Sequence, residues 1–209
     1  MAAQITHVAL AERVFDTYFY KFNRRDFIIG TLFPDIRLMG HIPRELTHFK
    51  RVGIQDVVNE KNSFMAGMLY HSLVDMIREE WMVGQGIYEL MPREYRWTQA
   101  IKFFEDRFFY TDTVNWEVVS HYFNTVLPEE LHFQMERPII ETWHRMLRNY
   151  LSTSPTTHTM IQSISDAGLD EQIGIDIDLH IQVIEKNSKI ISLCNEFKDN
   201  YENIIKNVL

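Results

Sequence analysis

Apolar residues recur at helical spacing along most of the chain. The first 22 residues carry apolar side chains three or four positions apart, at Ile5, Val8, Ala11, Phe15, Phe19 and Phe22. This spacing predicts a first helix over 4–22. Polar residues at 23–26 interrupt it, and a short apolar run over 27–32 follows.

The clearest helical pattern lies over 64–83. Its apolar side chains are Met65, Leu69, Leu73 and Met76. Asn62 or Ser63 precedes this pattern and is of the type that caps helix N-termini. Between the first helix and this one, Pro34 and Pro43 bracket a segment that we expect to form a loop.

Three aromatic-rich segments follow, and each has helical spacing. They cover 95–109, 114–127 and 129–151. Pro128 suits the first turn of the third helix, whereas Pro138 would lie inside it. An internal proline removes a backbone hydrogen bond, so we expect a kink at Pro138.

The segment 173–183 is ambiguous. Apolar and non-apolar residues alternate strictly there, which is typical of a strand, yet the same stretch also has apolar residues at helical spacing. A single strand would have no obvious partner elsewhere in the chain. We therefore favour a helix, followed by another helical segment over 190–208.

These patterns predict an all-α fold, a compact multi-helix bundle. The segment 152–159, STSPTTHT, has the composition of a linker. We expect a helical core over 1–152 and a C-terminal helical extension over 153–209 packed on it. The sequence leaves open whether the two form one domain and whether the C-terminal helices mediate homo-oligomer formation.

Composition narrows the classes of partner. The 209 residues are 45% hydrophobic and carry a net charge of −8. An acidic surface disfavours stable binding to nucleic acid or to an anionic membrane by charge alone. The chain has no transmembrane pattern, and its one cysteine, Cys194, cannot form an internal disulfide. We expect a cytoplasmic protein.

Candidate chemistry lies in an ordered series of histidines and aspartates. The series consists of His7, Asp35, His48, His71 and Asp75. His71 and Asp75 are four residues apart in the 64–83 helix, so both side chains project from one face. Imidazole nitrogens and carboxylate oxygens are typical ligands of Zn²⁺ and similar transition metals. We expect a metal site between the first helix, the 64–83 helix and the loop that joins them.

Taken singly, each of these residues has an ordinary structural explanation. A histidine and an aspartate four apart often form a hydrogen-bonded or solvated pair. Asp35 follows a proline and could cap the next turn. His7 and His48 could be ordinary surface or loop histidines. Only the order and joint context of the five residues favour a metal site.

The motifs that carry the series resemble a known family. They are THVALAERVF, F-x-x-G-T-L-F-P-D, R-x-x-T-H and F-M-A-G-M-L-Y-H-S-L-V-D, all within residues 1–83. This set is similar to the zinc-dependent phospholipase C family, whose superfamily includes zinc nucleases that cut single-stranded nucleic acid. The resemblance implies an all-α fold with a zinc cluster held between helices.

The resemblance also implies roles for individual residues. His7, Asp35, His48, His71 and Asp75 would be metal ligands, most simply of two zinc ions, with Asp75 bridging them and Asp35 as the general base. The implied activity is hydrolysis of a phosphate ester, in particular a phosphodiester with a small or lipid headgroup. The alternatives are a nuclease or nucleotide phosphoesterase on the same site, another divalent transition metal, and a non-enzymatic helical protein with a structural metal.

The chain departs from the family after Asp75. The family has a further histidine shortly after this aspartate, whereas this sequence has none before His121. His121, His132, Glu136 and His144 are the candidates for completing a third metal site. Three arginines near the predicted ligands could hold phosphate oxygens, namely Arg37, Arg44 and Arg51.

Overall fold

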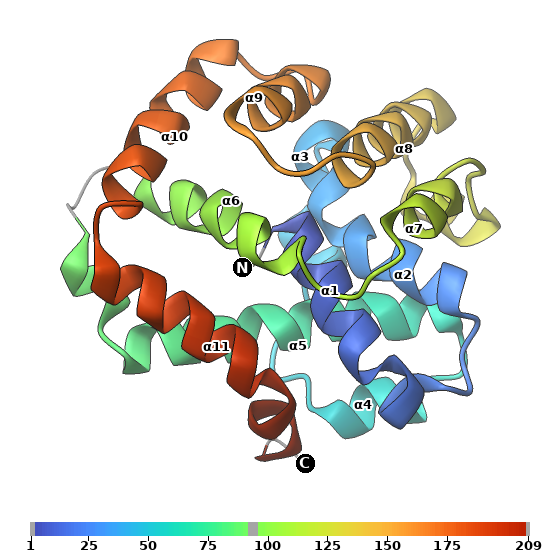
Figure 1. The fold of residues 1–209 in the computed structure, drawn as a ribbon. Helices are drawn as coiled ribbons and strands as arrows, with labels where there is room; N and C mark the ends of the chain where they lie inside the picture. Colours follow the sequence, from blue (N-terminus) through green and yellow to red (C-terminus); the bar gives the residue numbers. More distant parts are fainter. Residues whose placement is uncertain (1–2, 92–95, 208–209) are drawn as a thin grey trace.

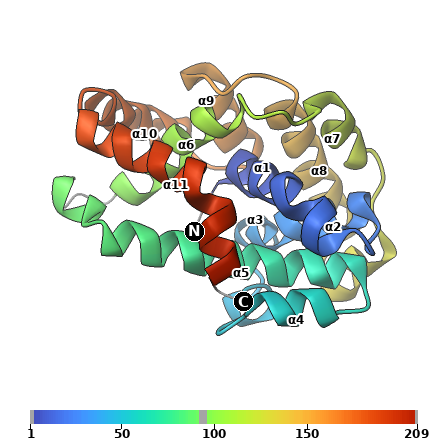
Figure 2. The ribbon, with the colours of Figure 1, turned by 60° about the horizontal axis from the view of Figure 1, so that its bottom comes forward.

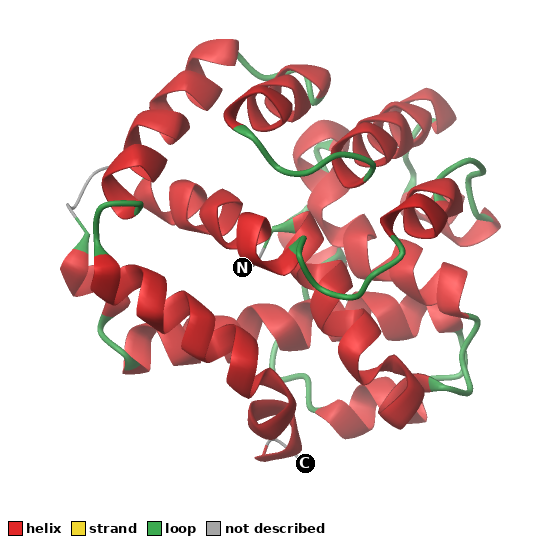
Figure 3. Ribbon diagram, viewed as in Figure 1, coloured by secondary structure: helices red, strands yellow, loops and turns green. Residues whose placement is uncertain are grey.

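The computed structural model describes residues 3–91 and 96–207, and within these ranges it is helical without a β-strand (Figure 3). The α-helices are α1 (Gln4–Val14), α2 (Arg24–Leu32), α3 (Arg37–Gly40), α4 (Ile54–Asn59), α5 (Ser63–Gly84), α6 (Trp97–Phe109), α7 (Trp116–Tyr122), α8 (Arg137–Leu151), α9 (Thr157–Asp166), α10 (Glu171–Ile184) and α11 (Ser188–Asn207). Short 3-10 segments lie at Phe33–Ile36, Arg44–Leu46, Ile87–Leu90 and Pro128–Phe133, and a π-helical turn lies at Phe15–Phe19. The predicted all-α class is confirmed.

Helix α1 lies inside the bundle, where it contacts α2, α5, α6 and α11 (Figures 1 and 2). Buried apolar side chains form two clusters. The larger one joins α1, α2, α5, α7 and α8 with the last turns of α11. The smaller one joins the end of α5 and most of α6 with α9, α10 and the first half of α11. Both clusters therefore contain residues from either side of position 152.

Helix α5 carries two of the predicted ligands and begins as the sequence indicates. The side chain of Asn62 accepts a hydrogen bond from the backbone N–H of Met65 at 2.9 Å, which caps the first turn. The helix then runs to Gly84. The side chains of α5 are buried where the helix packs against α2 and α4.

Helices α2 and α5 cross in backbone contact at a pair of glycines. A Cβ atom on Gly67 would lie 2.1 Å from the carbonyl oxygen of Phe27, and one on Gly30 would lie 2.0 Å from that of Phe64. Only glycine permits so close an approach. Gly67 lies one turn before His71, so α2 packs directly beside the face that carries the predicted ligands.

Three predicted helices have different bounds in the structure. The first ends as an α-helix at Val14 and continues as a π turn rather than reaching residue 22. The segment 114–127 contains only the short α7. The predicted kinked helix over 129–151 is wrong, because Gln134 adopts the left-handed conformation with φ of 55° and separates a 3-10 segment from α8. Pro138 lies in the first turn of α8, where its missing N–H is not needed.

The ambiguous segment 173–183 is helical, as favoured. Its alternation arises because α10 is apolar on two faces. Ile177 and Ile181 are buried against the smaller cluster, whereas Ile175, Leu179 and Val183 are 41%, 57% and 51% exposed. Within the described residues, no helix has both the length and the apolar character required to cross a membrane.

Candidate metal centre

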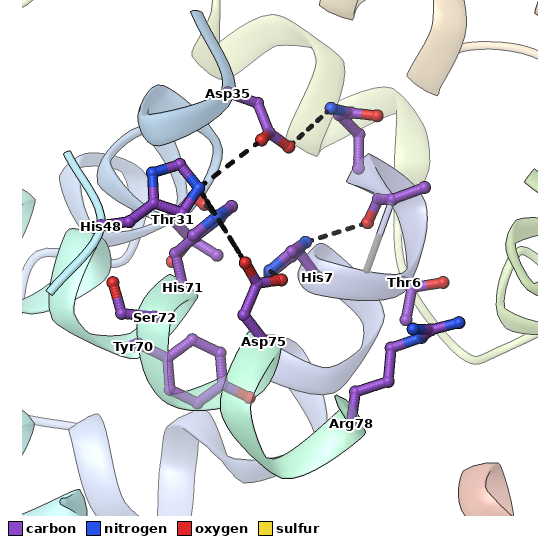
Figure 4. Close-up of polar contacts among 12 residues, drawn as sticks. Thr6, His7, Thr31, Asp35, His48, Tyr70, His71, Ser72, Asp75 and Arg78 are labelled. Atoms are coloured by element: carbon purple, nitrogen blue, oxygen red, sulfur yellow. Dashed lines mark hydrogen bonds and ion pairs between the residues drawn. The ribbon is translucent and has the colours of Figure 1, made fainter. Parts of the chain in front are cut away.

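Four separate elements bring the five predicted ligands together (Figure 4). His7 comes from α1, Asp35 from the 3-10 turn after α2, His48 from the loop before α4, and His71 and Asp75 from α5. All except Asp35 are buried, and the Asp35 side chain is 19% exposed. The structure thus places side chains from 7 to 75 in one polar pocket of the core.

The ligand atoms form two overlapping groups. One contains His7, His71 and Asp75, the other Asp35, His48 and His71, and the atoms of each group lie within 4.8 Å of one another. The Asp75 Oδ1 lies 3.6 Å from His7 Nε2, and its Oδ2 lies 3.6 Å from His71 Nε2 and 3.9 Å from His48 Nε2. Asp35 Oδ1 lies 3.9 Å from His48 Nε2. His48 Nε2 lies 3.2 Å from His71 Nε2, whereas the imidazole–carboxylate separations exceed ordinary hydrogen-bond lengths and leave room for an ion between the atoms.

The three imidazoles are oriented by contacts on their outer nitrogens. The Nδ1 of His7 lies 3.0 Å from the carbonyl oxygen of Ala3, and the Nδ1 of His71 lies 2.9 Å from that of Thr31. A carbonyl can only accept, so in both rings Nδ1 carries the proton and donates. The Nδ1 of His48 contacts the hydroxyl of the preceding threonine at 2.9 Å. Each Nε2 is thereby turned towards the centre, as in histidines that ligate metals.

A metal fits this arrangement because it would satisfy a buried atom. The Nε2 of His7 is inaccessible to solvent and makes no hydrogen bond within the described residues. Leaving a buried polar atom unsatisfied costs about 1–3 kcal/mol. The rings of His7 and His71 also stack in parallel with centroids 4.1 Å apart and an interplanar angle of 2°. Their Nε2 lone pairs are held side by side.

Burial sets the protonation of the cluster. It lowers the pKa of His7 to about 3, and the nearby His71 lowers it further. Burial likewise lowers the pKa of His48 to about 3 and lowers that of His71. The three imidazoles are therefore neutral near pH 7, which is the form that binds metals. Burial, and next the charge of Asp75, raise the pKa of Asp35.

A buried aspartate that sequence reasoning did not identify holds α1 in place. Asp106 of α6 accepts hydrogen bonds from the backbone N–H and hydroxyl of Thr6 at 2.8 and 2.7 Å, and from the Ile5 N–H at 3.4 Å. Tyr150 donates a further bond at 2.9 Å. Asp106 thus caps the first turn of α1, which has no capping side chain of its own, and fixes the position of His7.

A second unpredicted contact ties α5 to α6. Arg78, one turn after Asp75, donates from Nε to Glu105 Oε2 at 2.7 Å, and both side chains are 1% exposed. The signal was present, because Glu105 and Asp106 interrupt the aromatic run FFEDRFF on a predicted helix. Buried acidic residues in such a position require a partner, but the pattern alone does not name it.

The four candidates for a third site do not join the cluster. Neither group of metal-type side chains found among the described residues includes them. His121 and His132 are exposed, and Glu136 precedes α8 while His132 lies in the separate 3-10 segment. His132 and Glu136 therefore do not share a helix. His144 is buried and contacts Glu130 at 2.7 Å.

Two hollows flank the centre. The first, here called the cationic cavity, has a volume of about 550 Å³, and its charged lining consists of Arg44, Lys50, Arg51, Asp75, Glu79 and Lys102. The second, here called the apolar groove, has a volume of about 320 Å³, and its larger lining side chains include Asp35, Lys102, Met39, Phe103, Trp143, Met146 and Leu169. Asp75 opens to the first, Asp35 to the second, and Lys102 lines both.

Comparisons with protein-family models, with curated proteins and with solved structures find no match for this chain. The likeness to zinc-dependent phospholipases C therefore stays a prediction from short motifs. Functional inference depends on the geometry of the cluster and of the two hollows beside it.

Proposed function

We propose that the protein is a zinc-dependent hydrolase of phosphate esters, acting on a phosphodiester. One observation carries the proposal. Three imidazole Nε2 atoms and two carboxylates converge in a buried pocket, and each imidazole is oriented through its outer nitrogen. Such mixed nitrogen and oxygen donors suit Zn²⁺.

The residues that would hold the metal divide around one carboxylate. Asp75 directs Oδ1 towards His7 and Oδ2 towards His48 and His71, so it can bridge two ions. Asp35 supplies a carboxylate on the side of His48. A divalent ion held by these groups would activate water near neutral pH and polarise a phosphoryl oxygen.

The chain's own groups would complete the reaction. Asp35 is partly exposed, and Gln4 donates a hydrogen bond to its Oδ2 at 3.0 Å, which holds the carboxylate in position. A carboxylate in this position could accept a proton from the attacking water. Lys102 lies between the two hollows and Arg44 lines the cationic cavity, so both can bind oxygens of the phosphoryl group.

The two hollows favour a diester with unlike substituents. The apolar groove beside Asp35 offers the side chains of Met39, Phe103, Trp143 and Leu169. An apolar substituent there would leave the polar substituent in the cationic cavity beside Asp75. This arrangement supports a lipid-like phosphodiester over a substrate that is polar on both sides of the phosphorus.

Elemental analysis combined with hydrolysis of bis(p-nitrophenyl) phosphate tests the proposal. We expect two zinc ions per chain and turnover that disappears with a chelator and returns with zinc. Asp75→Asn should lose both metal and turnover, whereas His121→Gln, which alters an exposed histidine, should retain both. Zinc bound without hydrolysis of this or a lipid diester would instead indicate a structural metal and overturn the proposal.

A further inference from the structure

The cationic cavity concentrates positive charge on an acidic protein. The chain has a net charge of −8, yet Arg44, Lys50, Arg51 and Lys102 line this one cavity. The acidic lining consists of Asp75, which belongs to the metal cluster, and Glu79.

The two acidic groups, Asp75 and Glu79, are fewer than the four cations of the lining. Asp75 would be neutralised by the divalent ions of the proposed centre. Glu79 accepts a hydrogen bond from Tyr88 at 2.8 Å. Within the described residues, Lys50 and Arg51 form no ion pair, although their loop is close to α5. Lys50 and Arg51, which are not predicted metal ligands, can therefore bind an anion in this cavity.

The loop that carries these two cations is held in an uncommon conformation. Arg51 has φ of 58°, in the left-handed region that non-glycine residues rarely adopt. Two residues earlier, the N–H of Phe49 donates to the Ser72 hydroxyl at 3.0 Å, which attaches the loop to α5 one turn before Asp75. Backbone strain of this kind persists where surrounding contacts enforce it and is concentrated at functional sites.

One scissile phosphodiester does not require all of these groups. It carries a single negative charge, which the metal ions, Lys102 and Arg44 are sufficient to bind. We propose that Lys50 and Arg51 bind a second phosphate group, carried on the polar substituent of the substrate. This inference rests on the proposed function and specifies its substrate class: a phosphodiester whose polar substituent bears a phosphate monoester. A volume of about 550 Å³ admits a substituent of that size.

The same chemistry could reach the cavity from a lipid headgroup or from a nucleotide. Two matched substrate pairs separate these sources. The soluble pair is thymidine 5′-(p-nitrophenyl phosphate) with and without a 3′-phosphate. The lipid pair is phosphatidylinositol 4-phosphate and phosphatidylinositol in detergent micelles. Each pair differs by one phosphate monoester.

With the zinc-loaded protein, we expect kcat/KM to be at least about tenfold higher for the substrate with the extra phosphate in one pair, and that pair identifies the source. In Lys50→Gln/Arg51→Gln this ratio should fall towards one. Arg145→Gln/Arg137→Gln, which removes two arginines from a separate hollow near α7, should keep the wild-type ratio. A ratio near one in both pairs, or a ratio that the Lys50/Arg51 variant retains, overturns the inference.

A binding measurement distinguishes this failure from failure of the proposed function. Calorimetry on the zinc-loaded protein compares inositol 1,4-bisphosphate with inositol 1-phosphate, and thymidine 3′,5′-bisphosphate with thymidine 5′-phosphate. Tighter binding of a bisphosphate that depends on Lys50 and Arg51, without hydrolysis of any diester, would refute the hydrolase and retain the anion site. Hydrolysis of a diester without any preference for a second phosphate would retain the hydrolase and refute the anion site.

Discussion

Replacing Gly67 by alanine tests whether the contact between α2 and α5 orients the metal centre. The new Cβ would lie 2.1 Å from the carbonyl oxygen of Phe27 and 2.7 Å from the backbone nitrogen of Thr31. An ordinary contact begins at 3.4 Å, so the helices must separate by about 1.3 Å. Both contacts are with backbone, so no side-chain rotation relieves them. The displaced segment carries the Thr31 carbonyl that orients His71.

The expected magnitude follows from two opposing effects. Overpacking of a well-packed core costs about 1–3 kcal/mol, and we expect the upper end because the clash is with backbone. Alanine recovers up to about 1 kcal/mol of helix propensity. The free energy of unfolding should therefore fall by about 2 kcal/mol. Loss of the contact that orients a ligand typically lowers metal affinity 10- to 100-fold, which we expect here for zinc.

Chemical denaturation and competitive zinc titration measure the two effects. Gly84→Ala is a matched control, because Gly84 ends the same helix and its new Cβ would meet nothing within 4 Å. That variant should be as stable as the parent or up to about 1 kcal/mol more stable, with unchanged zinc affinity. Equal unfolding midpoints and equal zinc affinities in Gly67→Ala and Gly84→Ala would refute the reasoning.

Three further predictions follow from the buried contacts. Asp106→Asn should lower the free energy of unfolding by about 1–3 kcal/mol and weaken zinc binding, because the hydrogen bonds that Asp106 accepts from α1 are disrupted. Tyr150→Phe, measured in the same titrations, should cost about 1 kcal/mol and leave zinc affinity unchanged. Arg78→Met should cost about 3–5 kcal/mol in denaturation experiments by leaving Glu105 uncompensated, and Glu105→Gln added to it should recover part of the loss; fully additive costs would contradict this pairing. With free zinc at 100 times its dissociation constant, removal by a chelator should cost about 2.7 kcal/mol, seen calorimetrically as a fall in Tm of roughly 5–10 °C that is absent in His71→Ala.

Local signals account for what the sequence predicts correctly. The α5 helix has its cap at Asn62 and its apolar spacing within one continuous segment, so its start was predicted to within one residue. His71 and Asp75 share a face for the same local reason. The convergence of His7, Asp35 and His48 on that face is not local, and only the order of the motifs indicated it.

Contacts between distant segments account for what the sequence did not predict. The first turn of α1 is capped from α6, about 100 residues away, so no pattern around Thr6 could indicate Asp106. The break near Gln134 depends on a left-handed backbone that the periodicity of 129–151 does not reveal. In α10, apolar residues on an exposed face produced an alternation that resembles a strand.

The acceptors that orient His7 and His71 are main-chain carbonyls of Ala3 and Thr31. No substitution at either position can delete a carbonyl oxygen. A saturation-mutagenesis scan would therefore report on the side chains at these two positions and not on the carbonyl oxygens that the centre requires. Such a scan would instead detect intolerance to substitution at Gly30 and Gly67, where the spacing of α2 and α5 is set. Mutational tolerance alone would therefore miss the main-chain contacts that orient His7 and His71.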